Sequence, residues 1–331
     1  MPSSRSTPSL FDVILGVPRV STQAWRRLGW WRRALFTVRA ATLPLTLLSC
    51  LFGGLMALPW TPAEGGRLVV VTSTLVVVHA AANLLNDQVN WMLGVHRDAA
   101  ELRHRYGAHP LAEGLIHPVG HVVFLALTVA GALALGLLVT GMAGTPAWWM
   151  AGIGAVLAIS YTWPLQRVGL GEVAVFLLWG PMMVGGVYWV VSGDWGAEIL
   201  ILSVLFGLGP AVAALGANAD KRRGDERRGL RTLPVILGPA GGPRLVAAVA
   251  LTQMLAVVSW AWSTGSWPYV LLLAALPALS KLVWICSRRR PGARPRGYAA
   301  DVWPLWYSIA AFRFARAAGA AFAVAALLEG I

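Results

Sequence analysis

Residues 67–90 read RLVVVTSTLVVVHAAANLLNDQVN, and this stretch sets the class of the protein. Residues 68–82 contain no Asp, Glu, Lys or Arg, and most of them are Val, Leu or Ala. A helix of about 20 apolar residues spans the roughly 30 Å hydrocarbon core of a bilayer. The sequence therefore predicts a transmembrane helix over residues 67–86 that ends in a polar motif.

The whole chain has the same character, with 57% apolar and only 12% charged residues, roughly half the charged fraction of a soluble domain. Further apolar runs of about spanning length lie at residues 35–60, 119–140, 146–164, 170–192, 197–217, 243–263, 267–286 and 304–328. We therefore predict an all-α, multi-pass transmembrane bundle of about nine helices. The net charge of +13 does not indicate nucleic acid, because the basic residues fall between apolar runs and not on one soluble face.

The basic residues also predict an orientation in the cell membrane. With nine spans, all of the 27 Lys and Arg residues except Arg67, Arg313 and Arg316 lie on one side. Cytoplasmic loops are rich in Lys and Arg, so the N-terminus and the even-numbered loops are expected in the cytoplasm. Residues 1–33 are expected to form a basic, Trp-containing segment at an anionic membrane surface, and residues 34–331 the transmembrane domain.

The first polar motif lies at the end of the predicted helix over residues 67–86. Asn83, Asn86, Asp87 and Asn90 share one helical face, because residues three and four apart are neighbours on a helix. Such a stripe at the end of a membrane helix is costly unless it faces a polar cavity or a ligand. The alternative is a solvated helix end with ordinary capping.

The second polar motif, residues 218–234, reads NADKRRGDERRGLRTLP and is expected as a loop after the sixth span. Asp and Asn oxygens suit Mg²⁺, while Lys and Arg suit phosphate oxygens, so the two motifs together have the groups that a metal-bound diphosphate requires. Both motifs are expected on the same side of the membrane, where they can converge over one cavity. The alternative for the second motif is a basic loop that only sets topology. Neither motif contains a glycine-rich nucleotide loop, so ATP is not indicated.

Three segments in this order resemble the UbiA superfamily of intramembrane prenyltransferases, most closely its 1,4-dihydroxy-2-naphthoate branch in the menaquinone pathway. They are NLLND at residues 83–87, YTWPLQRVGLGE at residues 161–172 and DERRGLRTL at residues 225–233. The resemblance covers roughly residues 35–330. It implies that Mg²⁺ binds the diphosphate of an isoprenyl donor, and that the isoprenyl group passes to a small aromatic or quinonoid acceptor next to membrane lipid.

The resemblance also implies roles for individual residues. Asp87, Asp225 and Tyr161 are the expected catalytic residues, and Tyr161 would contact the acceptor or the allylic cation. The expected Mg²⁺ ligands are Asp87, Asn90, Asp220 and Asp225. The residues expected to bind substrate are Asn83, Asn86, Arg39, Arg97, Lys221 and Arg231.

The sequence departs from the family pattern at several acidic positions. Asn90 and His96 stand where the family usually has aspartates, Lys221 replaces an aspartate of the second motif, and Asp220 lies one residue early. A shifted register or a single metal ion would compensate for the lost negative charge. Two other functions stay open, namely a membrane terpene cyclase that uses the donor alone and a non-catalytic membrane carrier or scaffold.

Overall fold

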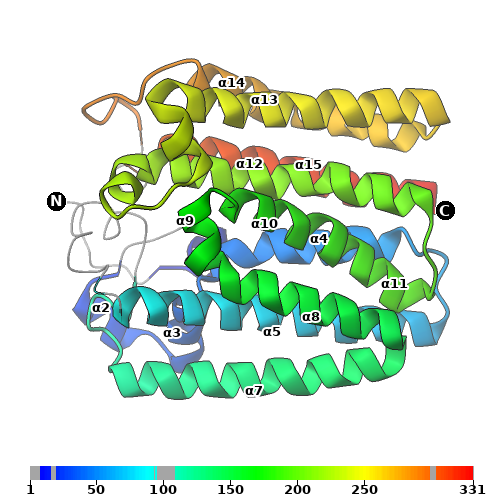
Figure 1. Cartoon of the computed structure of the whole chain (residues 1–331), viewed down its shortest axis with the longest axis horizontal. Coiled ribbons are helices and arrows are strands. Elements are labelled where there is room, and N and C mark those ends of the chain that lie inside the picture. Colours follow the sequence, from blue (N-terminus) through cyan, green and yellow to red (C-terminus); the bar gives the residue numbers. More distant parts are fainter. Residues whose placement is uncertain (1–7, 16–19, 93, 95–108, 299–302, 331) are drawn as a thin grey trace. The chain divides into compact units, whose positions relative to one another are not determined.

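The computed structural model describes residues 8–15, 20–92, 94, 109–298 and 303–330, and these residues form helices and connecting turns with no strand (Figure 1). Seven helices are long and apolar enough to cross a membrane, and the bent pair Trp30–Thr37 and Ala40–Leu55 makes up to eight within the described part of the chain. The shorter apolar helix Thr145–Ser160 corresponds to the remaining predicted span. Each of the nine predicted ranges overlaps one of these elements, which confirms the all-α, multi-pass class.

The α-helices are α1 (Leu10–Leu15), α2 (Thr22–Arg27), α3 (Trp30–Thr37), α4 (Leu43–Leu55), α5 (Pro62–Met92), α7 (Pro118–Ala143), α8 (Thr145–Ser160), α9 (Gln166–Val168), α10 (Gly171–Leu177), α11 (Gly186–Ser192), α12 (Ala197–Arg227), α13 (Leu233–Thr264), α14 (Leu276–Cys286) and α15 (Tyr307–Glu329). Two π-helical segments, Tyr161–Leu165 and Leu178–Gly185, and two 3-10 segments, Ala40–Thr42 and Trp267–Ala275, connect them.

The chain divides into two compact units. Unit 1 contains Met1–Pro44, Val76–Ala134 and Pro291–Leu305, and unit 2 contains Leu45–Leu75, Leu135–Arg290 and Trp306–Ile331. The first polar motif belongs to unit 1, and the second belongs to unit 2.

The N-terminal helices of unit 1 pack around an aromatic pair. Trp25 and Phe36 are both buried, and their ring centroids lie 6.1 Å apart in an edge-on arrangement. Trp30, in contrast, is 82% exposed. The basic segment therefore buries one tryptophan and presents another, while its predicted binding to an anionic membrane surface and the boundary after residue 33 stay predictions.

In unit 2, α12 packs along α13 and α15, as Figure 1 shows. A buried aromatic cluster fixes this packing: Phe206 of α12 stacks on Phe52 at 5.3 Å between ring centroids and meets Phe322 of α15 at 5.4 Å. Small residues such as Gly216 let α12 approach α15 closely, since a Cβ at Gly216 would lie 2.5 Å from the Cβ of Ala311.

Gly180→Ala tests the close packing of α12. A Cβ at Gly180 would lie 2.6 Å from the Ser203 carbonyl oxygen and 2.8 Å from the Cα of Gly207, both backbone atoms that cannot rotate away. We expect a loss of about 1–3 kcal/mol of stability and a lower Tm in detergent. Gly152→Ala on α8 is the control, because no atom lies within 4 Å of its Cβ position. Equal Tm values for the two variants would contradict the packing.

The second polar motif is not a loop as predicted. α12 continues without a break to Arg227, so residues 218–227 are helical. Hydropathy detects only the apolar part of a helix, and the polar end is held here by packing against α15 and by the Arg222–Glu226 pair one turn apart. α5 likewise extends beyond its predicted end at residue 86 to Met92, because hydropathy does not detect the polar end of a helix.

Candidate active site

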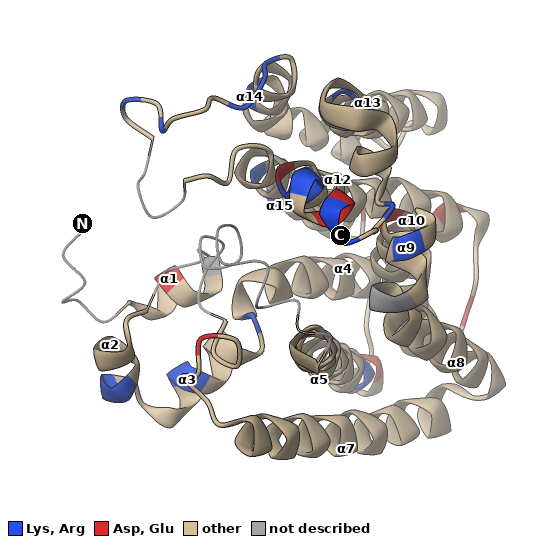
Figure 2. Ribbon diagram, turned by 60° about the vertical axis from the view of Figure 1, so that its left-hand side comes forward, with Lys and Arg blue, Asp and Glu red and all other residues tan. Residues whose placement is uncertain are grey.

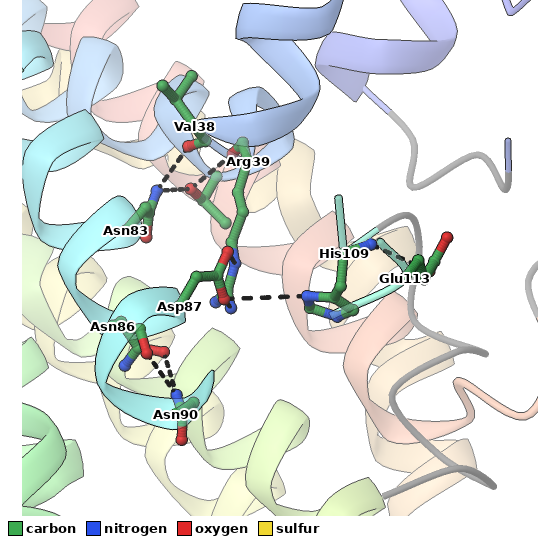
Figure 3. Close-up of polar contacts among 9 residues, drawn as sticks. Val38, Arg39, Asn83, Asn86, Asp87, Asn90, His109 and Glu113 are labelled. Carbon is green, nitrogen blue, oxygen red and sulfur yellow. Dashed lines mark hydrogen bonds and ion pairs between the residues drawn. The ribbon is translucent and has the colours of Figure 1, made fainter. Parts of the chain in front are cut away.

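Asp87 and Arg39 form the centre of the first motif. Arg39 Nε donates to Asp87 Oδ2 at 3.2 Å, and Arg39 Nη2 donates to Asp87 Oδ1 (Figure 3). This bidentate contact is the geometry in which guanidinium and carboxylate bind most strongly. The side chain of Asp87 is only 9% exposed. Its charge is therefore held in place by an arginine that comes from a distant part of the sequence, before α4.

The backbone of Arg39 is itself unusual. Arg39 has φ 55° and ψ 53°, and it is the only residue other than glycine with a positive φ in the described part of the chain. This left-handed conformation costs a side-chain-bearing residue of order 1–3 kcal/mol and persists only where its surroundings hold it. It directs the Arg39 side chain towards Asp87.

Asn83 supplies part of this support. Its Nδ2 donates to the Val38 carbonyl oxygen at 2.9 Å and to Thr42 Oγ1 at 3.1 Å, and Thr42 Oγ1 in turn donates to the Arg39 carbonyl oxygen at 2.9 Å (Figure 3). Asn83 therefore clamps the segment that carries Arg39 onto α5. These contacts give Asn83 a positioning role, and its predicted binding of substrate stays a prediction.

Asn86 and Asn90 form a second pair one turn further along α5. Asn90 Nδ2 donates to both the carbonyl oxygen and Oδ1 of Asn86, each at 2.7 Å. This contact engages the amide nitrogen of Asn90 and directs its Oδ1 away from Asn86, as Figure 3 shows. His109 completes the group, since its Nδ1 lies 3.9 Å from Asp87 Oδ1. His109 was not among the predicted site residues, and only its position among several histidines near the motif could have pointed to it.

The first motif fits a magnesium ion in the chemistry of its donors. Asp87 offers a carboxylate, and Asn86 and Asn90 offer amide oxygens. Among the described residues no group of three or more His, Cys, Asp or Glu side chains is arranged to hold a metal. A Mg²⁺ ion commonly takes one or two protein carboxylates and completes its shell with water and substrate phosphates, so a site with one carboxylate is sufficient.

In unit 2, Asp220 caps the N-terminus of α15. Asp220 Oδ1 accepts from the Tyr307 backbone N–H at 3.2 Å, and Oδ2 accepts from the Ser308 N–H at 2.9 Å and from Ser308 Oγ at 2.6 Å. The first backbone N–H groups of a helix have no partner within the helix, so a carboxylate there is stabilising. Asp220, which was expected to bind Mg²⁺, is therefore engaged in holding α12 to α15.

Asp220→Ala is expected to destabilise the protein. It would leave the Tyr307 and Ser308 N–H groups and the Ser308 hydroxyl without their acceptor in a buried place, at a cost of about 1–3 kcal/mol for each group left unpaired. We expect the Tm in detergent to fall by roughly 5 °C or more. Glu226→Ala, which breaks an exposed pair with Arg222, should leave the Tm nearly unchanged. Similar Tm values for both variants would show that the cap carries little stability.

Asp225 lies on another face of α12 and pairs with a basic residue at the end of the same helix. Arg228 Nη2 donates to Asp225 Oδ1 at 2.7 Å, and Arg228 Nε donates to the Gly224 carbonyl oxygen at 2.9 Å. Figure 2 shows the basic and acidic residues gathered at this end of α12. Arg228 was not among the predicted site residues, although its spacing of three from Asp225 could have indicated the pair.

The segment after α12 is tied to the segment that carries Tyr161. The Arg231 backbone N–H donates to the Gln166 carbonyl oxygen at 3.1 Å. Tyr161 begins the π-helical segment Tyr161–Leu165, and π-helical turns are frequent at functional sites. Arg97, the remaining predicted residue, lies outside the described residues.

A buried polar pair also joins α10 to α12. Asn218 Nδ2 donates to Glu172 Oε1 at 2.8 Å, and both residues are only 2% exposed. Glu172 lies in one of the three segments that resemble the family, but it was not among the predicted site residues. The hydrogen bond holds Glu172 beside α12, at the first residue of the second motif.

Comparison with known proteins supports the family resemblance. The sequence profile of the UbiA prenyltransferase family matches residues 46–309. The 1,4-dihydroxy-2-naphthoate octaprenyltransferase of Haemophilus influenzae is 26% identical over 286 residues, which cover 80% of this chain and 88% of that protein. The digeranylgeranylglyceryl phosphate synthase of Natronomonas pharaonis is 27% identical over 179 residues, which cover 53% of this chain and 62% of that protein.

Solved structures share the fold. The apo structure of a UbiA homolog from Aeropyrum pernix K1 superimposes with a TM-score of 0.61 at 16% identity and covers 86% of this chain and 98% of its own. The structure of a digeranylgeranylglyceryl phosphate synthase gives a TM-score of 0.55 at 15% identity and covers 90% of this chain and 99% of its own. Because the family profile extends over most of the sequence, the chain belongs to the UbiA prenyltransferase family.

Proposed function

We propose that this membrane prenyltransferase transfers an isoprenyl group from an isoprenyl diphosphate to a small aromatic or quinonoid acceptor in a Mg²⁺-dependent reaction. The observation that carries the proposal is the Asp87 carboxylate, held by Arg39 at the polar end of a membrane helix, where the Asn86–Asn90 pair lies on the same helix. The protein is proposed to lie in the cell membrane with both polar motifs on the cytoplasmic side, as the distribution of basic residues predicts.

The residues of this chain would act on the diphosphate end of the donor. Asp87, Asn86 and Asn90 would hold Mg²⁺, which supplies positive charge against the leaving diphosphate. Arg39 and Asn83 keep Asp87 in position. Lys221, Arg231 and Arg97 are proposed to bind phosphate oxygens. The proposed metal set leaves out Asp220, which caps α15, and Asp225, which lies between the cations Lys221 and Arg228 on one face of α12.

The chemical step breaks the bond between the allylic carbon and the diphosphate oxygen, and the diphosphate leaves with the electron pair. A nucleophilic carbon of the acceptor ring then bonds to the allylic carbon, and the ring loses a proton or a carboxyl group as CO₂ to regain aromaticity. Tyr161 is proposed to contact the allylic cation or the acceptor. Apolar surroundings keep water away from the cation, so that it reacts with the acceptor.

The acceptor is proposed to be a bicyclic aromatic compound of the dihydroxynaphthoate kind, and the proposed pathway is menaquinone biosynthesis. The relative named for that acceptor aligns with 80% of this chain, whereas the relative named for a glyceryl phosphate product aligns with 53%. An aromatic ring activated by hydroxyl groups is also electron-rich enough to attack an allylic cation.

Product analysis tests the proposal. The purified protein in lipid vesicles is given labelled isoprenyl diphosphates of several chain lengths with Mg²⁺, with and without 1,4-dihydroxy-2-naphthoate. We expect a labelled prenylated naphthalene that forms only when the acceptor is present. A cyclic hydrocarbon formed from the donor alone would instead show a terpene cyclase, and an intact donor in a folded sample would contradict both enzymes.

A further inference from the structure

The acidic side chains at the polar end of α12 are all engaged in contacts other than metal binding. Asp220 accepts three hydrogen bonds at the start of α15, Asp225 accepts from Arg228, and Glu226 accepts from Arg222 at 2.9 Å. Asp220 is 3% exposed, so it has no access to a ligand without loss of its cap. A Mg²⁺ ion at Asp225 would have to displace Arg228, as an ion at Asp87 would have to displace Arg39, but it would also meet a second cation, Lys221, on the same face of α12.

The helical periodicity separates two faces at this end of α12. One face carries a stripe of four residues whose spacings are three, four and three, namely Asn218, Lys221, Asp225 and Arg228. Asp220 lies about 120° away from the middle of the stripe on a helix with 3.6 residues per turn. The contact between Asp220 and α15 therefore fixes the rotation of α12, and with it the direction in which the stripe faces.

The side chains of the stripe itself are more basic than acidic. Its single carboxylate, Asp225, lies 2.7 Å from the guanidinium of Arg228, and Lys221 is a further cation on the same stripe. A carboxylate from another element, Glu172 of α10, faces the first residue of the stripe and accepts a hydrogen bond from Asn218. Arg228 uses Nε and Nη2 in the two contacts described above, whereas a guanidinium group has five N–H donors. A divalent cation at this stripe would meet two positive side chains, while an anion would meet complementary charge and directed donors.

We propose that this stripe binds the diphosphate directly through Lys221 and Arg228 and holds no metal ion of its own. Asp225 is then a positioning residue for Arg228, and Asp220 is a structural cap. The inference rests on the proposed function for the identity of the anion. The second motif differs from the family pattern at Asp220 and Lys221. The inference explains this difference by a single metal ion per chain, bound at Asp87, and not by a shifted register of metal ligands.

Two binding measurements on the full chain in lipid nanodiscs test this inference. The first counts Mn²⁺ ions bound per chain by electron paramagnetic resonance in the presence of inorganic pyrophosphate. We expect one ion for the native protein and for Asp225→Asn, and none for Asp87→Asn. Two ions in the native protein, with one lost in Asp225→Asn or Asp220→Asn, would overturn the inference and leave the proposed function standing.

The second measurement is pyrophosphate affinity without metal. We expect Lys221→Gln and Arg228→Gln to weaken binding at least about tenfold, and Asp225→Asn to weaken it less, because the asparagine oxygen can still accept from Arg228 while a negative charge is removed. Arg222→Gln is the matched control, since it removes the same charge from α12 away from the stripe. Native affinity in Lys221→Gln and Arg228→Gln would overturn the inference. Loss of affinity in these two variants together with no bound Mn²⁺ in the native protein would support binding of the anion by the stripe, but it would contradict the single metal ion at Asp87 and the Mg²⁺ part of the proposed function.

Discussion

We expect Asp87→Asn to lower the rate of diphosphate release from an isoprenyl diphosphate by roughly three orders of magnitude. A bound metal ion is worth several kcal/mol of transition-state stabilisation, and each 1.36 kcal/mol corresponds to a factor of about ten in rate. The substitution keeps the size of the side chain but removes the only carboxylate of the first motif and the charge that pairs with Arg39. The measurement is kcat and KM for a labelled donor in lipid vesicles.

Asp194→Asn is the control for this prediction. Asp194 is exposed and accepts a hydrogen bond from the Trp195 N–H at 2.7 Å, which an asparagine oxygen can also accept. Its kcat and KM should equal those of the native protein. A kcat for Asp87→Asn within a few-fold of the native value would show that Asp87 does not hold a catalytic metal.

Arg39→Lys is expected to lower kcat/KM by about 10- to 100-fold although the charge is retained. Removing a residue that orients a metal ligand typically has an effect of this size. Lysine cannot reproduce the two parallel hydrogen bonds that Arg39 makes to Asp87. The same variant should weaken Mn²⁺ binding in the presence of pyrophosphate.

The charge-preserving change separates two roles for Arg39. If Arg39 served only as a point charge for the diphosphate, Arg39→Lys would retain most activity and most Mn²⁺ affinity. Arg67→Lys is the matched control, because Arg67 donates to the Val191 carbonyl oxygen at 3.4 Å and has no part in either motif. A native Mn²⁺ affinity in Arg39→Lys would contradict the positioning role.

The sequence predicted the helices well because apolar runs of spanning length are a local signal. It predicted the end of α12 poorly, since residues 218–227 are polar and their helix depends on packing against α15. Hydropathy contains no information on such packing, so the polar turns were expected as a loop.

Helical spacing placed the polar residues of the first motif on one face of α5 but could not indicate their partners. The partner of Asp220, in contrast, lies 88 residues later at Ser308, and the contact that fixes Arg39 comes from Asn83 through Val38 and Thr42. Pairs so distant in sequence have no periodicity that connects them, so Asp220 was expected as a metal ligand and only the structure indicates a cap.

The most direct test of the account is Mg²⁺-dependent consumption of a labelled isoprenyl diphosphate by the purified protein in lipid vesicles. The account predicts release of diphosphate that stops when Mg²⁺ is chelated, resumes when Mg²⁺ is restored, and is accompanied by transfer of the label to an aromatic acceptor. Donor consumption that continues unchanged after chelation, or no consumption of any donor by a folded sample, would contradict it.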